Sequence, residues 1–315
     1  MVTPYPTLNL STISDIQSIR DKIIIVCGAT ASGKSSFAAQ LSRNLDVVII
    51  NCDAVQVYKE LPILTASPVM TSTNSSHKLY NIVSCSESFS VCDWLGLAHK
   101  EIDSCIAGRF QDLPSAHPQT PILVGGSGMY ISALMDGMSS IPETKGEFRQ
   151  RSRSLLEEVG IIKMYNMLKV IDPKLAAKLK STDSQRIARG LEVFWQTGRK
   201  LSEWHDMGKT GHYRREDFFV ILLSPPREEL YCNINARFLL MLDGGLLREV
   251  AALSRETKHK AIGVKEVRAY LDGIMTLKVM IESVQQATRN YAKRQMTWFR
   301  NQIKPDIILK PSMVP

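Results

Sequence analysis

The segment with the most specific chemistry in this sequence is a glycine-rich stretch that ends in lysine and serine. Its eight residues match the phosphate-binding pattern G-x-x-x-x-G-K-[ST] at every fixed position; they are Gly28, Ala29, Thr30, Ala31, Ser32, Gly33, Lys34 and Ser35. Glycine lets such a loop turn its N–H groups inward, the lysine adds positive charge, and the serine can hold Mg²⁺. The alternative is a plain glycine turn without a ligand, but a chance match to the whole pattern is rare.

The residues around this loop predict the elements that position it. Residues 22–27 form an aliphatic run of strand length, residues 34–44 have helical spacing, and residues 46–51 form a second run. This order predicts a strand–helix–strand unit and therefore a parallel sheet covered by helices. The loop then lies at a helix N-terminus, where free N–H groups and the helix dipole favour phosphate.

A phosphate loop does not by itself specify ATP. Nucleoside triphosphatases usually carry an acidic residue after a further apolar strand. Here the apolar run 121–124 is followed by Gly125-Gly126-Ser127-Gly128, which contains no acid. This argues against a motor or a switch and leaves small-molecule kinases and other users of a diphosphate.

Asp53 and Ser127 each follow a predicted strand. Ligands of open parallel sheets bind beyond the carboxyl ends of the strands, so we expect both side chains near the phosphate loop. The Asp53 carboxylate could accept a proton or bind a metal-held water, and the Ser127 hydroxyl could orient a substrate. The alternatives are a helix-capping aspartate and an ordinary glycine-rich turn.

The rest of the chain predicts a P-loop NTPase-like α/β core interrupted by helices. No buried-strand pattern follows Pro142 until residues 218–223. We expect the first part of the core in residues 1–140, a helical insertion domain in 141–213, and a return to the core with C-terminal helices in 214–315. Helices are expected near 91–107, 228–254 and 276–303, and a polar surface loop at 67–77.

The composition indicates where this protein acts in the cell more than which reaction it catalyses. Its 44% apolar and 22% charged residues are typical of a globular protein, and a net charge of +8 weakly favours a polyanionic partner. No apolar run approaches 18 residues, and the N-terminal segment has no signal-peptide pattern, so we expect a cytoplasmic protein without a membrane span. The six cysteines form no C-x-x-C pair, which argues against a zinc site and for free thiols.

Seven blocks in order resemble the tRNA dimethylallyltransferases, the isopentenyltransferases of tRNA, over residues 23–303. The blocks are CGATASGKS (27–35), DAVQVYK (53–59), PILVGGSGMY (121–130), DSQRIARGLEV (183–193), MLDGGLLREV (241–250), AIGVKE (261–266) and TRNYAKRQMTWF (288–299). The sequence carries no C-terminal zinc finger, so it resembles the bacterial form. It departs from the family pattern at Ala29, Ala54, Ser127, Asn233 and Val264, and in the segments 62–68 and 77–81.

The resemblance implies transfer of a dimethylallyl group from dimethylallyl diphosphate to N6 of adenosine 37 of tRNA. It implies that residues 28–35 hold the diphosphate, that Ser35 binds Mg²⁺, that Asp53 is the general base, and that Ser127 orients the base or the amine. The adenine must leave its stack to react. The implied tRNA contacts are Asp53, Ala54, Val55, Gln56, Ser127, Arg149, Gln185, Arg186, Ile187, Ala188 and Arg189.

Two helix faces are candidates for tRNA binding. Gln185, Arg186 and Arg189 cluster by i, i+3 and i+4 spacing, although a solvated, ion-paired face would show the same spacing. The last helix is free of acids from residue 283 to 304. It is expected to bury Val284, Ala287, Tyr291 and Trp298 and to expose Arg289, Lys293 and Arg300.

Two other functions remain open at this point. A small-molecule kinase with a helical lid would bind ATP and transfer a phosphoryl group. A non-catalytic RNA-binding protein with a relic phosphate loop would bind tRNA and give no product. For the transferase we expect a monomer.

Overall fold

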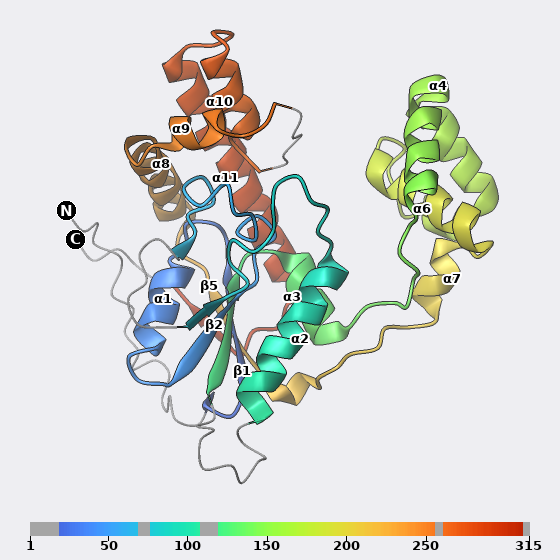
Figure 1. The fold of residues 1–315 in the computed structure, drawn as a ribbon. Coiled ribbons are helices and arrows are strands. Elements are labelled where there is room, and N and C mark those ends of the chain that lie inside the picture. The colour runs from blue at the N-terminus through green and yellow to red at the C-terminus, as the bar shows by residue number, and fades with distance from the viewer. Residues whose placement is uncertain (1–18, 69–75, 108–118, 256–260, 311–315) are drawn as a thin grey trace. The chain divides into compact units, whose positions relative to one another are not determined.

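The computed structural model describes residues 19–68, 76–107, 119–255 and 261–310 (Figure 1). The chain divides into two compact units. One unit is drawn from Met1–Met135 and Tyr213–Pro315, and the other is Asp136–His212. The helical insertion was predicted at 141–213, so the compact unit starts a few residues before the predicted boundary.

The first unit contains one six-stranded sheet in the order β3-β2-β4-β1-β5-β6, with every pair parallel. The predicted strands at 22–27, 46–51, 121–124 and 218–223 are confirmed, whereas two three-residue edge strands were not predicted. β3 begins within the segment predicted as a surface loop at 67–77, which is therefore wrong for Ser76 and His77; residues 69–75 lie outside the described residues. The strands are β1 (Ile23–Gly28), β2 (Val47–Asn51), β3 (Ser76–Lys78), β4 (Thr120–Gly125), β5 (Phe218–Leu223) and β6 (Ile307–Leu309).

Helices cover both faces of this sheet (Figure 1). Successive β1 residues alternate between two apolar clusters because strand side chains point to opposite faces. On one face α1 (Lys34–Leu41) packs through Phe37. On the other face lie α2 (Val91–Ala107), α3 (Gly128–Asp136) and the C-terminal part of α11 (Leu277–Gln302), through Trp94, Ile131 and Phe299. The helix predicted at 91–107 is confirmed from its first residue, Val91, to the last described residue of that segment, Ala107.

The C-terminal part of the first unit is a group of helices. The segment predicted as helical near 228–254 contains α8 (Arg227–Asp243) and α9 (Leu246–Ala251), which are separated at Gly244 and Gly245. Gly245 has φ 99, a left-handed conformation that glycine adopts without strain. The short helix α10 (Val264–Leu271) was not predicted.

The buried face of α11 differs in part from the prediction. Val284 is buried as expected, but Ala287, Tyr291 and Trp298 are only partly buried. The buried residues of this helix are Met280, Val284, Ala292, Gln295 and Phe299. Gln295 is the polar residue of this buried face, and a buried side-chain amide is expected to have hydrogen-bond partners.

The second unit contains helices around an apolar core of its own. Its helices are α4 (Gly146–Ile171), which is kinked at Gly160, α5 (Pro173–Ala176), α6 (Ser184–Thr197) and α7 (Leu201–Asp206). The Asp183 side chain accepts a hydrogen bond from the Arg186 N–H and caps α6. A bridge between Met138 and Thr210 joins the two ends of the unit.

Candidate functional site

The glycine-rich loop connects the end of β1 to the start of α1, as predicted. Gly28 has no room for a Cβ because the Leu223 carbonyl oxygen would lie 2.6 Å from it. Gly33 has φ 89 and Ala31 has φ 62, so a residue with a Cβ also takes the left-handed conformation here. The buried Ser32 hydroxyl has no hydrogen-bond partner in the described part of the chain. A polar loop at a helix N-terminus is suited to an anion.

Lys34 lies among opposing charges at this loop. Its Nζ donates to the Ala29 carbonyl oxygen at 2.6 Å. Burial lowers the pKa of Lys34 to about 8; the Asp53 carboxylate opposes this shift and the Arg237 guanidinium adds to it. The Lys34 ammonium therefore interacts with both Asp53, the candidate base, and Arg237, a second cation. Its charge is sensitive to pH just above neutrality.

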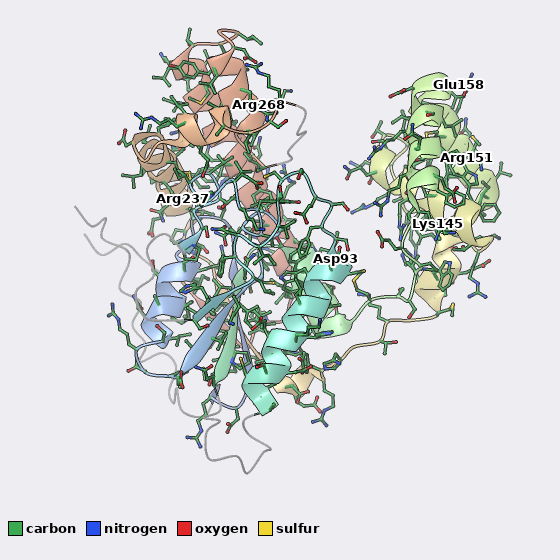
Figure 2. The ribbon with its side chains drawn as sticks, viewed as in Figure 1. Asp93, Lys145, Arg151, Glu158, Arg237 and Arg268 are labelled. Atoms are coloured by element: carbon green, nitrogen blue, oxygen red, sulfur yellow. The ribbon has the colours of Figure 1, made fainter. Side chains whose placement is uncertain are left out.

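Three side chains from the C-terminal helices hold the loop, and none was predicted as a site residue. Arg237 on α8 donates from Nη2 to the Thr30 hydroxyl at 2.6 Å (Figure 2). Asn233 donates to the Ala31 carbonyl at 3.4 Å. Gln295 accepts from the Thr30 N–H at 2.9 Å and donates to the Gly126 carbonyl, also at 2.9 Å. The sequence offered two signals: Asn233 departs from the family pattern, and Gln295 is an uncharged residue within a block otherwise notable for its arginines and lysines.

Asp53 and Ser127 are brought together at the carboxyl ends of β2 and β4. The Ser127 hydroxyl accepts the N–H of Ala54 at 2.8 Å. The Asp53 Oδ1 accepts the Val55 N–H at 3.1 Å, and the Asp53 N–H donates to Asn51 Oδ1 at 2.8 Å. No helix begins at Asp53 in the described part of the chain, so the carboxylate closes a turn and does not cap a helix.

The glycines around Ser127 mark close contacts and not merely a turn. A Cβ on Gly125 would collide with the backbone of Cys52. A Cβ on Gly126 would collide with the Gln295 amide, and one on Gly128 with the Trp298 indole. The Gly-Gly-Ser-Gly segment is therefore required for packing β4 and α3 against β2 and α11.

Tyr291 lies near the Asp53 carboxylate, whereas Gln56, three residues further along the chain, bonds the loop after β2. Burial raises the pKa of Tyr291, and the charge of Asp53 raises it further, while a hydrogen bond with Ser127 opposes both. The Tyr291 hydroxyl thus stays protonated near neutral pH. Gln56 uses its amide to donate to the carbonyls of Thr65 and Ala66, at 2.9 and 3.0 Å. Its described bonds therefore shape the loop that follows β2.

The predicted tRNA-contacting residues of the insertion differ in accessibility. Gln185 and Arg186 are exposed on α6, and Arg186 pairs with Asp183 at 3.4 Å. Arg189 is half-buried and donates to the hydroxyl of the buried Thr144.

Three further residues complete that set, and one of them corrects the prediction. Ile187 is 0% exposed in the core of the insertion, so its assignment as a tRNA contact is wrong for its side chain. Ala188 is partly buried against the same core. Arg149 lies on α4 and pairs with Glu143 at 3.2 Å.

Comparison with known proteins identifies the family. A model described as IPP transferase matches residues 56–302, and one described as isopentenyl transferase matches residues 21–86. The chain belongs to the IPP transferase family. It is 39% identical over 302 residues to a tRNA dimethylallyltransferase of Rickettsia prowazekii, covering 93% of this chain and 94% of the relative. The match to a tRNA dimethylallyltransferase of Rickettsia canadensis is also 39% identical, over 300 residues, and covers 93% and 90%.

Solved structures of this family share the fold. A full-length tRNA isopentenylpyrophosphate transferase from Bacillus halodurans has a TM-score of 0.62 at 31% identity, covering 94% of this chain and 92% of that one. A eukaryotic dimethylallyltransferase acting on tRNA has a TM-score of 0.77 at 28% identity, covering 93% and 74%. No helix within the described residues has the length and apolar character needed to cross a membrane.

Proposed function

We propose that this protein transfers the dimethylallyl group of dimethylallyl diphosphate to N6 of adenosine 37 in tRNA and releases diphosphate. The observation that carries the proposal is that the phosphate loop after β1 and Asp53 after β2 lie at the same edge of the parallel sheet, on strands that flank β4; the effect of the Asp53 carboxylate on the pKa of Lys34 agrees with this proximity. This arrangement means that a site for a leaving anion and a proton acceptor lie within reach of one substrate. The family and the names of the relatives support the same reaction.

The loop supplies the electrostatic part of the mechanism. The N6 amine attacks the first carbon of the prenyl group, the carbon–oxygen bond breaks, and its electron pair leaves with the diphosphate. Negative charge therefore grows on the oxygen that faces the loop. Lys34 and the free N–H groups at the start of α1 stabilise this charge, because they are already oriented before the reaction begins.

Asp53 and Ser127 supply the proton chemistry. The attacking amine must lose a proton, and Asp53 accepts it as general base. In the described part of the chain the Asp53 side chain accepts its hydrogen bond through Oδ1, so Oδ2 takes the proton. Ser127 accepts from the Ala54 N–H and bonds the Tyr291 hydroxyl; when substrate is bound, its hydroxyl hydrogen can be donated to the carboxylate or the amine and orient it.

The residues present fit a Mg²⁺ ion held largely by the substrate. Ser35 is exposed in the first turn of α1 and would offer its hydroxyl as a ligand. Among the described residues no group of three or more His, Cys, Asp or Glu could hold a metal. This agrees with the preference of Mg²⁺ for phosphate oxygens and water over an all-protein cage. Bound there, the ion would neutralise charge on the leaving diphosphate.

We place tRNA recognition on the insertion, through Arg149, Gln185, Arg186 and Arg189. Arg186 is exposed and Arg149 and Arg189 are partly exposed; arginines suit phosphate contacts, which position a nucleic acid without reading its sequence. Ala54, Val55 and Gln56 follow Asp53 directly and are proposed to contact the unstacked adenosine. Because the substrate is tRNA and one chain carries every proposed group, we propose a monomer that acts in the cytoplasm.

The deciding experiment is incubation with dimethylallyl diphosphate, Mg²⁺ and unmodified tRNA, followed by mass analysis of the nucleosides. We expect adenosine that carries one dimethylallyl group, and none with Lys34→Ala. Phosphoryl transfer from ATP without a prenylated product would favour a kinase. Binding of tRNA without product would favour a non-catalytic RNA-binding protein.

A further inference from the structure

We propose that Gln295 is a positioning residue that holds the phosphate loop in the shape required for diphosphate. The inference rests on the proposed function, because it assigns a role in binding the same ligand. Gln295 lies on α11, far along the chain from the loop, and is 6% exposed. Its amide reaches both the loop, at the Thr30 N–H, and the end of β4, at the Gly126 carbonyl.

The chemistry of this link selects a primary amide. The Thr30 N–H needs an acceptor and the Gly126 carbonyl needs a donor, both at 2.9 Å from the same side chain. A carboxylate can only accept, and a thioether is a weak acceptor that cannot donate. Gly126 has no space for a side chain because the Gln295 amide occupies it. The sequence at β4 and the side chain on α11 therefore fit each other.

The link also decides which loop groups face the ligand. Because Gln295 engages the Thr30 N–H, and Arg237 engages the Thr30 hydroxyl, Thr30 is held on the side of the C-terminal helices. In the described part of the chain the Thr30 and Ser32 N–H groups have partners within the protein, and the N–H groups that remain for diphosphate are those of Ala31 and of the residues from Gly33 into the first turn of α1. This assigns Thr30 to the support of the loop instead of to direct phosphate binding through its N–H.

One side chain thereby couples two parts of the site. Gly126 is the neighbour of Ser127, whose hydroxyl meets the Ala54 N–H beside Asp53. Fixing Thr30 and Gly126 to the same amide sets the distance between the diphosphate loop and the strand end that carries the proton chemistry. A loop ordered in advance loses less freedom on binding, so its affinity is higher.

The test compares Gln295→Met, which removes both hydrogen bonds at similar length, with Gln295→Glu. Gln302→Met, on the exposed last turn of α11, is the matched control. Binding of inorganic diphosphate with Mg²⁺ is measured by calorimetry at several pH values, well below each variant's unfolding temperature. The parent is measured at every pH, so that titration of Lys34 and of the ligand cancels in the ratio.

We expect Gln295→Met to weaken diphosphate binding about ten-fold, the scale of one net hydrogen bond, at every pH. Gln295→Glu should bind more weakly still near pH 8, because its charge opposes the diphosphate and faces the Gly126 carbonyl. Its deficit should shrink at lower pH, where a protonated carboxyl can again donate to Gly126. The control should bind as the parent does.

Two results would overturn the proposal. One is a folded Gln295→Met variant with the parent's diphosphate affinity and only a lower unfolding temperature, which would make Gln295 a packing residue. The other, informative even if Gln295→Met does not fold, is a Gln295→Glu deficit that does not change with pH. Failure of the parent itself to bind diphosphate would instead refute the diphosphate site of the proposed function.

Discussion

Replacing Asp53 with asparagine separates its chemical role from its role in the turn. The Val55 N–H is accepted by Asp53 Oδ1, and the Asp53 N–H is held by Asn51. An asparagine retains an oxygen for the first bond and the backbone N–H for the second. We therefore expect the free energy of unfolding to change by less than about 0.5 kcal/mol, as for a substitution that leaves such bonds intact.

The expected loss of rate is much larger than any effect through the turn. Removing a general base lowers the rate by roughly 10²–10⁴-fold. A second effect must be separated from this one. Asp53 supports the charged form of Lys34, whose pKa is already lowered to about 8. Without the carboxylate that pKa falls further, so diphosphate affinity near pH 8 also decreases. At pH 6.5, well below about 8, the charge of Lys34 is better preserved in both proteins, and with saturating dimethylallyl diphosphate the difference in rate should reflect the chemical step.

The assay is single-turnover prenyl transfer at pH 6.5 with saturating dimethylallyl diphosphate and an unmodified tRNA anticodon stem-loop. Thermal unfolding and tRNA binding serve as controls, and both should match the parent. If the rate of the Asp53→Asn variant stays within a few-fold of the parent, Asp53 is a residue of the turn and the proton has another acceptor.

Three further predictions concern Lys34 and the insertion. Lys34→Ala should weaken dimethylallyl diphosphate binding and leave tRNA affinity unchanged, as calorimetry with each ligand alone would show; ATP hydrolysis lost with this change, and no prenyl transfer in the parent, would contradict it. In the parent, affinity for a prenyl diphosphate should fall as pH rises through about 8, because Lys34 loses its charge there, and the Lys34→Ala variant should lack that step. Arg186→Ala should lower the slope of log affinity for tRNA against log salt by roughly 0.7–0.9, the value for one phosphate contact; an unchanged slope would exclude this side chain from the interface. Adding Arg189→Ala should double that change but also lower thermal stability, since Arg189 holds Thr144.

The parts of the fold that the sequence predicted are those with a strong local pattern. The four long strands are aliphatic runs that lie in the middle of a parallel sheet, and the start of α2 at Val91 was placed correctly. The edge strands β3 and β6 have three residues each, too few for a periodic pattern to emerge. The helix break at Gly244 and Gly245 was missed because each side of it continues the same helical spacing.

The candidate site shows a different limit. Asp53 and Ser127 could be placed together because the ends of parallel strands share one edge. Gln295 could not, because its two partners lie far from it in the chain and a glutamine on a helix usually faces solvent. Ile187 was assigned to tRNA because it belongs to the family-like block 183–193 together with Arg186 and Arg189. Its place in the helical period puts it opposite these two arginines, and its side chain is buried.

The strand order has a consequence for how this protein emerges from the ribosome. β1, which leads into the phosphate loop, lies between β4 and β5, and β5 follows the whole insertion in the chain. Until β5 has been synthesised, one edge of β1 has no neighbour, and exposed strand edges favour aggregation. The insertion is a contiguous segment with its own core, so it can complete its fold first. A ribosome stall between the insertion and β5 should therefore release chains with a folded insertion and an open sheet, the form on which a chaperone would act.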